Sequence, residues 1–153
     1  ASILLIIMKI EIDQSGKIEF TSVGTIVGDS QGNFVFIKAK TKRLIQSLFR
    51  NAKKPRKFII ETFVFLVAKL IQVSFSKKNI YILDIEYPGK QKEITKSLIS
   101  ICHKLQTQIN LSQIRFSHIG KRSKAHSTAY LQFKRKNKKV DITVRSFLRT
   151  FLP

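Results

Sequence analysis

Two hydrophobic periodicities divide the chain into strands and helices. Short apolar runs bounded by Gly, Asn or Asp predict strands, and apolar positions three or four residues apart predict amphipathic helices. Residues 40–57 fit either a helix or a loop. The predicted strands are residues 3–13, 20–28, 34–39, 79–87 and 113–120. The predicted helices are residues 58–73, residues 90–108 and a last helix that Ser123 caps, with Ala125, Ala129, Tyr130 and Phe133 facing inward.

The connections between these elements predict how the strands pair. Tight turns such as "GDSQGN" at residues 28–33 join the first three strands into an antiparallel meander. The helix at residues 58–73 returns the chain parallel to the first strand, and residues 79–87 are nearly continuously apolar, as in a strand covered on both faces. We therefore expect an α/β fold in one domain, residues 1–153. Its mixed five-stranded sheet has three antiparallel strands, then parallel strands, and is flanked by helices.

The charge of the chain indicates a polyanionic partner. Its 153 residues include 29 Lys and Arg but only 9 Asp and Glu, a formal net charge of +20. Such an excess favours nucleic acid over an anionic membrane surface. The apolar run at residues 58–75 is interrupted by Glu61, Lys69 and Gln72, which favours a buried helix over a membrane span.

The single cysteine bears on the compartment. Cys102 excludes an intrachain disulfide and any zinc site built from cysteines, and it lies on the apolar stripe of the helix at residues 90–108. We expect a core thiol in a reducing compartment, and hence a cytoplasmic protein.

Several of the few acidic residues fall near the ends of predicted strands. Asp13 ends the first strand, and the alternation of side chains places it on one face with Glu11 and places Asp84 on one face with Glu86. If these two strands are neighbours whose connections leave in opposite directions, a crevice forms at their carboxyl ends. We expect the carboxylate of Asp13 to lie within about 4–8 Å of that of Asp84 or Glu86 or both, where Mg²⁺ or Mn²⁺ offsets their repulsion.

Each of these acids also has an ordinary structural interpretation. Asp13 can start a turn, Asp84 can pair with a lysine, and Glu86 can face solvent. Acids at the ends of two strands that meet at one crevice favour the metal site.

Basic residues and a histidine surround the start of the last helix. His126 can face the same crevice as a metal ligand or a proton shuttle. Lys121, Arg122 and Lys124 can hold phosphates there, because a helix start offers free amide donors to an anion. Glu61 stands alone on an apolar helix and needs either a lysine partner or a place at the metal site.

The motifs "IEIDQSG", "ILDIEYPGK" and "IGKRSKAH" resemble three conserved positions of the ribonuclease H-like superfamily. Its nucleases carry an Asp on the first strand, an acid at the end of the fourth strand, and an Asp or His on the last helix. The resemblance covers nearly the whole chain. It implies two magnesium ions held by the residues at these positions, which here are Asp13, Asp84, Glu86 and His126.

RuvC-type Holliday-junction resolvases are the nearest comparison within the superfamily. Some of them have a histidine on the last helix and an Asp three positions after it. This chain has His126 but Ala129 at the later position. The ribonuclease H branch has an extra Glu on its first helix, and Glu61 stands at the matching position.

We thus expect a metal-dependent nuclease that hydrolyses phosphodiester bonds of DNA or RNA, with a structure-specific enzyme such as a junction resolvase among the options. The alternative is a non-catalytic RNA-binding protein, such as a ribosomal protein with a similar α/β fold. A membrane-surface protein is a third interpretation, based only on the charge and the apolar run. The sequence leaves open the choice of DNA or RNA, the number of metal ions and a homodimer.

Overall fold

The computed structural model describes residues 7–135 and 142–151 of the chain. Its centre is a five-stranded sheet in the order β3-β2-β1-β4-β5. The pairs β1–β2 and β2–β3 are antiparallel, whereas β1–β4 and β4–β5 are parallel. The predicted mixed sheet of three antiparallel and then parallel strands is therefore confirmed. The strands are β1 (Lys9–Ser15), β2 (Thr25–Asp29), β3 (Phe34–Ile37), β4 (Ile80–Asp84) and β5 (Ile114–Ser117).

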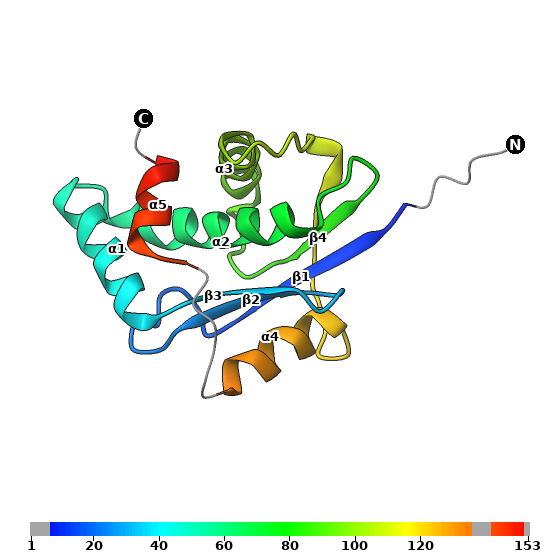
Figure 1. Cartoon of the computed structure of the whole chain (residues 1–153), viewed down its shortest axis with the longest axis horizontal. Coiled ribbons are helices and arrows are strands. Elements are labelled where there is room, and N and C mark those ends of the chain that lie inside the picture. Colours follow the sequence, from blue (N-terminus) through cyan, green and yellow to red (C-terminus); the bar gives the residue numbers. More distant parts are fainter. Residues whose placement is uncertain (1–6, 136–141, 152–153) are drawn as a thin grey trace, which may run out of the picture.

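Helices cover both faces of this sheet. In Figure 1, α4 lies on one face, and the other described helices lie on the opposite face. Two short 3-10 turns, Pro55–Lys57 and Leu111–Gln113, precede α2 and β5. The α-helices are α1 (Ala39–Asn51), α2 (Phe58–Ser74), α3 (Gln91–Lys104), α4 (Lys124–Lys134) and α5 (Val144–Phe151).

The helix α2 forms the centre of the core. It is apolar on nearly all sides because it lies between the sheet and the other helices of its layer, and Val64, Phe65 and Leu66 are fully buried. This confirms the predicted buried helix. Within residues 7–135 and 142–151, no helix combines the length and apolar character that crossing a membrane requires. Cys102 is buried in the same core, where burial raises the pKa of its thiol to about 12.

Several predicted strands are longer than those observed. Of the first predicted strand, residues 3–6 lie outside the described residues, and β1 begins at Lys9. The third strand was predicted to reach residue 39, but β3 ends at Ile37 because α1 begins at Ala39. The region that fitted either a helix or a loop, residues 40–57, is mostly helical. After β4 ends at Asp84, the chain bends, so Glu86 follows the strand instead of belonging to it.

The second strand, predicted from residue 20, starts at Thr25, and a buried lysine contacts the turns that precede it. Lys42 of α1 is fully buried, and its Nζ donates hydrogen bonds to the carbonyl oxygens of Lys17 and Phe20 at 3.2 and 2.8 Å and to Thr25 Oγ1 at 3.0 Å. These carbonyls belong to the turns before β2, so the lysine connects α1 to these turns. Burial lowers the pKa of Lys42 to about 8.

A glycine lets α4 approach the sheet closely. A Cβ atom at Gly28 would lie 2.9 Å from the backbone nitrogen of Ala129. We therefore predict that Gly28→Ala lowers the free energy of unfolding by about 1–3 kcal/mol, because backbone atoms must shift to admit the methyl group. Gly120→Ala is the matched control, since a Cβ there meets nothing within 4 Å. Urea unfolding measures both variants, and equal stabilities would contradict the prediction.

Candidate metal centre

The strands β1 and β4 meet where the direction of the chain connections changes. They are parallel neighbours, with β2 on the outer side of β1 and β5 on the outer side of β4. Ile12 pairs with Leu83, so the next residues, Asp13 and Asp84, come side by side at the carboxyl ends. In open α/β sheets, this crevice is where ligand sites form.

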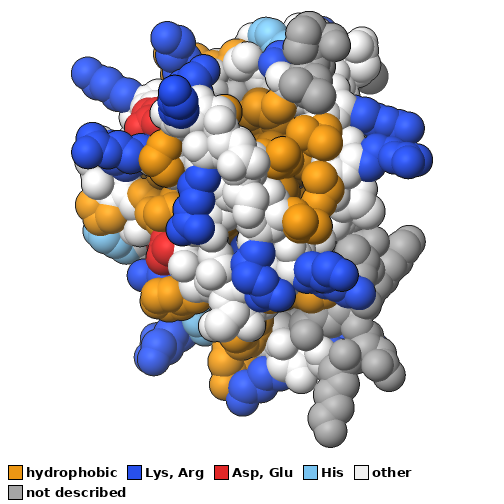
Figure 2. Space-filling view, turned by 90° about the vertical axis from the view of Figure 1, so that its left-hand side faces the viewer, with side chains coloured by type: hydrophobic (Ala, Val, Ile, Leu, Met, Phe, Trp, Pro, Cys, Tyr) orange, Lys and Arg blue, Asp and Glu red, His pale blue; other side chains and the backbone are white. Residues whose placement is uncertain are grey.

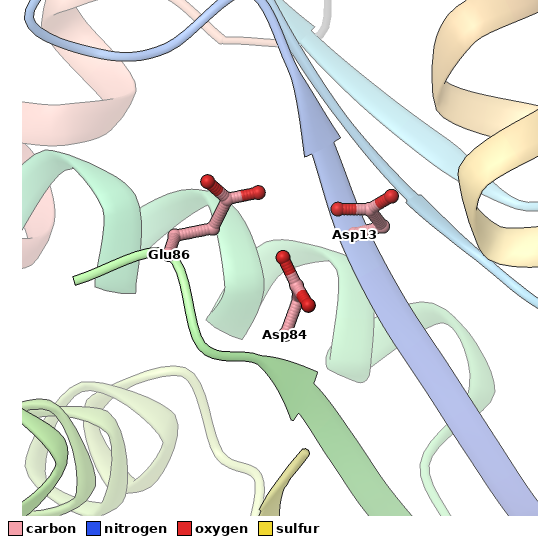
Figure 3. A group of neighbouring side chains, drawn as sticks. All are labelled: Asp13, Asp84 and Glu86. Carbon is pink, nitrogen blue, oxygen red and sulfur yellow. The ribbon is translucent and has the colours of Figure 1, made fainter. Parts of the chain in front are cut away.

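Three carboxylates converge at this crevice. Asp13, Asp84 and Glu86 each offer an oxygen atom, and these atoms all lie within 4.8 Å of one another. Figure 3 shows the side chains coming from β1, from the end of β4 and from the segment after it, with their carboxylates close together. Asp13 is only 6% exposed, and the other two are half-buried. The expected convergence is confirmed.

Burial and mutual repulsion make this cluster costly when it is fully ionised. The pKa of Glu86 is raised to about 8, chiefly by burial and further by Asp84. Burial also raises the pKa of Asp13, as does the charge of Asp84, while a hydrogen bond with His126 opposes the rise. Near neutral pH the cluster therefore favours a bound proton or a bound cation. Three carboxylates offer the hard oxygen ligands that Mg²⁺ and Mn²⁺ prefer, so the donor set fits either ion.

Backbone amides hold two of the carboxylates in place. The amide of Ile119 donates to Asp84 Oδ1 at 2.7 Å. A backbone amide thus anchors Asp84, where the structural interpretation of this residue expected a lysine. The amide of Gln14 donates to Asp13 Oδ1 at 2.9 Å. Oriented carboxylates of this kind are typical of metal ligands, whose outer hydrogen bonds fix their geometry.

Gln14 lies beside the carboxylates but was not among the predicted site residues. Its side chain is 7% exposed, its Nε2 donates to the hydroxyl of Tyr87 at 3.1 Å, and its hydrogen bond with Glu86 lowers the pKa of that carboxyl against the effect of burial. Gln14 Oε1 is buried without a hydrogen-bond partner. No signal in the sequence pointed to Gln14, because the first strand was predicted to end at Asp13, whereas β1 continues to Ser15.

The helix α4 brings His126 to the carboxylates. Ser123 caps the helix by accepting from the amide of Ala125 at 3.1 Å, and its hydroxyl also donates to Glu11 Oε1 at 3.1 Å. His126 Nδ1 lies 3.0 Å from Asp13 Oδ2, and its side chain is 34% exposed. The histidine therefore faces the predicted crevice, where it contacts a candidate ligand. It is not one of the three groups within 4.8 Å of one another.

Glu61 lies outside this cluster. Ser97 Oγ of α3 donates to Glu61 Oε2 at 3.0 Å. The partner of Glu61 is therefore a hydroxyl group, where we expected a lysine or the metal site. The side chain also lines a cavity of about 690 Å³ formed by α1, α2, α3 and α5. The structure therefore does not bring together Glu61 and the residues that the resemblance groups with it.

Basic side chains lie at the start of α4 and also far from it. Lys121, Arg122 and Lys124 are exposed and flank Ser123. The hydroxyl group of Ser123 contacts Glu11, which is two residues before Asp13 on β1. Figure 2 shows the side of the molecule that carries α1 and α5, where Lys and Arg surround an apolar patch and little acidic surface is visible. Positive charge is thus available both beside the carboxylates and across another face.

Comparisons with known proteins do not extend these observations. No protein-family model, no curated protein and no solved structure matches the chain.

Proposed function

We propose that the chain is a metal-dependent nuclease of the ribonuclease H-like type that hydrolyses phosphodiester bonds of DNA or RNA. The observation that carries the proposal is the convergence of Asp13, Asp84 and Glu86 within 4.8 Å in a chain whose net charge is +20. Acidic groups gathered in so basic a protein have a direct use when a cation and a phosphate are both to be bound.

Each residue has a distinct role in the proposed reaction. The three carboxylates hold Mg²⁺ or Mn²⁺, and a bound ion supplies an activated water and stabilises the leaving oxygen. His126 orients Asp13 through its Nδ1 contact and is placed to exchange a proton with the reacting groups. Lys121, Arg122 and Lys124 bind substrate phosphates, which positions the strand without reading its sequence.

A non-catalytic RNA-binding protein is the second candidate function. It is favoured by the Lys and Arg side chains on the face that carries α1 and α5, which is a different surface from the start of α4 (Figure 2). Both functions predict binding that weakens as salt rises, because both depend on phosphate neutralisation. Salt dependence therefore does not separate them, whereas catalysis does.

A cleavage assay tests the proposal. We expect the wild-type protein to cut at least one labelled substrate in Mg²⁺ or Mn²⁺ and to cut none in EDTA, because the carboxylates act through the cation. The panel contains single strands, duplexes, DNA–RNA hybrids and four-way junctions, with products resolved on denaturing gels. Absence of cleavage of every substrate with either metal, together with tight binding, would support the RNA-binding candidate instead.

A further inference from the structure

The helix α4 leads from the carboxylates past the carboxyl end of β1. Its contacts follow β1 in order: Ser123 bonds to Glu11, and His126 then bonds to Asp13. Further along, the ring of Phe133 lies 2.6 Å from the position that a Cβ atom of Gly16 would occupy. The helix and the strand thus run in the same direction, so the second half of α4 extends away from the candidate metal centre.

An exposed aromatic ring lies on this second half. Tyr130 was predicted to face inward, but it is 42% exposed, because Ala125 and Ala129 fill the close contact of α4 with the sheet. Its ring is nearly parallel to that of His126, with an angle of 9° and a centroid separation of 6.0 Å. Lys134 Nζ lies 4.5 Å from the centroid of the Tyr130 ring.

His126, Tyr130 and Lys134 therefore form a stripe at spacings of four residues. An aromatic ring beside a lysine matches a nucleotide, whose base stacks on the ring while its phosphate pairs with the cation. Tyr130 lies about 6 Å and Lys134 about 12 Å beyond His126 along the helix axis. Stacked nucleotides rise about 3.4 Å along each strand, so a base at Tyr130 belongs within about two nucleotides of a phosphate at the carboxylates.

We infer that Tyr130 and Lys134 bind an unpaired nucleotide beside the scissile phosphate, and that the substrate therefore carries a single-stranded segment there. A base inside a duplex is already stacked on both sides and has no free face for Tyr130. Lys134 is exposed, and its long side chain can leave the ring for a phosphate when a base arrives. This inference rests on the proposed function for the position of the scissile phosphate, but the stacking itself needs neither metal nor cleavage.

Photocrosslinking and binding in EDTA test the inference directly. The probes are 12-nucleotide oligothymidine and oligouridine strands, each with one 5-iodouracil, and a duplex of the same length. We expect crosslinks that mass spectrometry places at Tyr130. We expect Tyr130→Leu to weaken binding of the single strands about 5- to 150-fold and binding of the duplex less than about 2-fold.

Matched variants separate stacking from general damage to the helix. Tyr130→Phe should retain single-strand binding, and so should Leu131→Ala, which alters a more exposed neighbour at 62% exposure. An equal loss for single strands and duplex, no loss at all, or crosslinks only at other residues would overturn the inference. Cleavage without a Tyr130 crosslink would refute the nucleotide site at Tyr130 alone. A Tyr130 crosslink without cleavage in any metal would refute the nuclease function and leave a single-strand binding site.

Discussion

Asp13→Asn should abolish metal-dependent cleavage, with a loss of more than about 100-fold, and leave nucleic-acid binding unchanged or tighter. Asn keeps the size of the side chain but removes the negative charge that attracts the cation. Binding persists because the phosphate contacts come from Lys and Arg. Removing a buried anion also reduces repulsion of the substrate. Single-turnover cleavage and fluorescence anisotropy in EDTA measure the two effects separately.

Two further variants make this result interpretable. Glu93→Gln removes a carboxylate on the exposed surface of α3, so it should cut at the wild-type rate. His126→Ala should slow cleavage less than Asp13→Asn if the histidine moves a proton, and about as much if it binds the metal. Cleavage by Asp13→Asn at the wild-type rate would show that the carboxylates are structural and would favour the RNA-binding function.

The part of the site that could be predicted from the sequence is the part that strand geometry determines. Asp84 ends β4 and Asp13 lies two residues before the end of β1, and parallel neighbours bring their carboxyl ends together regardless of side-chain detail. The position of His126 followed from the cap at Ser123, which sets where α4 begins. These features depend on local periodicity and on the direction of the chain, both of which are visible in one sequence.

The features that depend on tertiary packing could not be predicted in the same way. Because α2 is apolar on nearly every side, its periodicity does not show which direction Glu61 faces, and its partner Ser97 lies 36 residues away. The helical pattern placed Tyr130 inward, but the contact of Gly28 with Ala129 leaves room only for small residues there. The eight-residue α5 was not predicted, since it is too short to show a clear repeat.

Glu86 should make the metal-free protein less stable as pH rises. Its pKa is about 8 in the folded state against an ordinary 4.5, so the folded state binds a proton that the unfolded chain has already released. The stabilisation from this proton is complete below about pH 4.5 and is lost as pH rises through 8. In EDTA, we expect the free energy of unfolding to fall across this window, by at most about 1.4 kcal/mol per pH unit for one proton. Asp13, whose pKa is also raised, adds an effect of the same sign.

Glu86→Gln should remove most of this slope, because the neutral amide has no proton to lose. It should therefore be more stable than the wild type at pH 8 in EDTA. In 10 mM MgCl₂ this difference in stability should narrow or reverse, since an ion that binds only the folded wild type adds RT ln(1 + [Mg²⁺]/Kd) to its free energy of unfolding. Urea unfolding from pH 5 to 8 in both buffers measures these effects, with Glu93→Gln as the exposed control. An unchanged slope in Glu86→Gln would show that Glu86 is not the group that titrates, and a wild type unaffected by Mg²⁺ or Mn²⁺ at pH 8 would count against the metal centre itself.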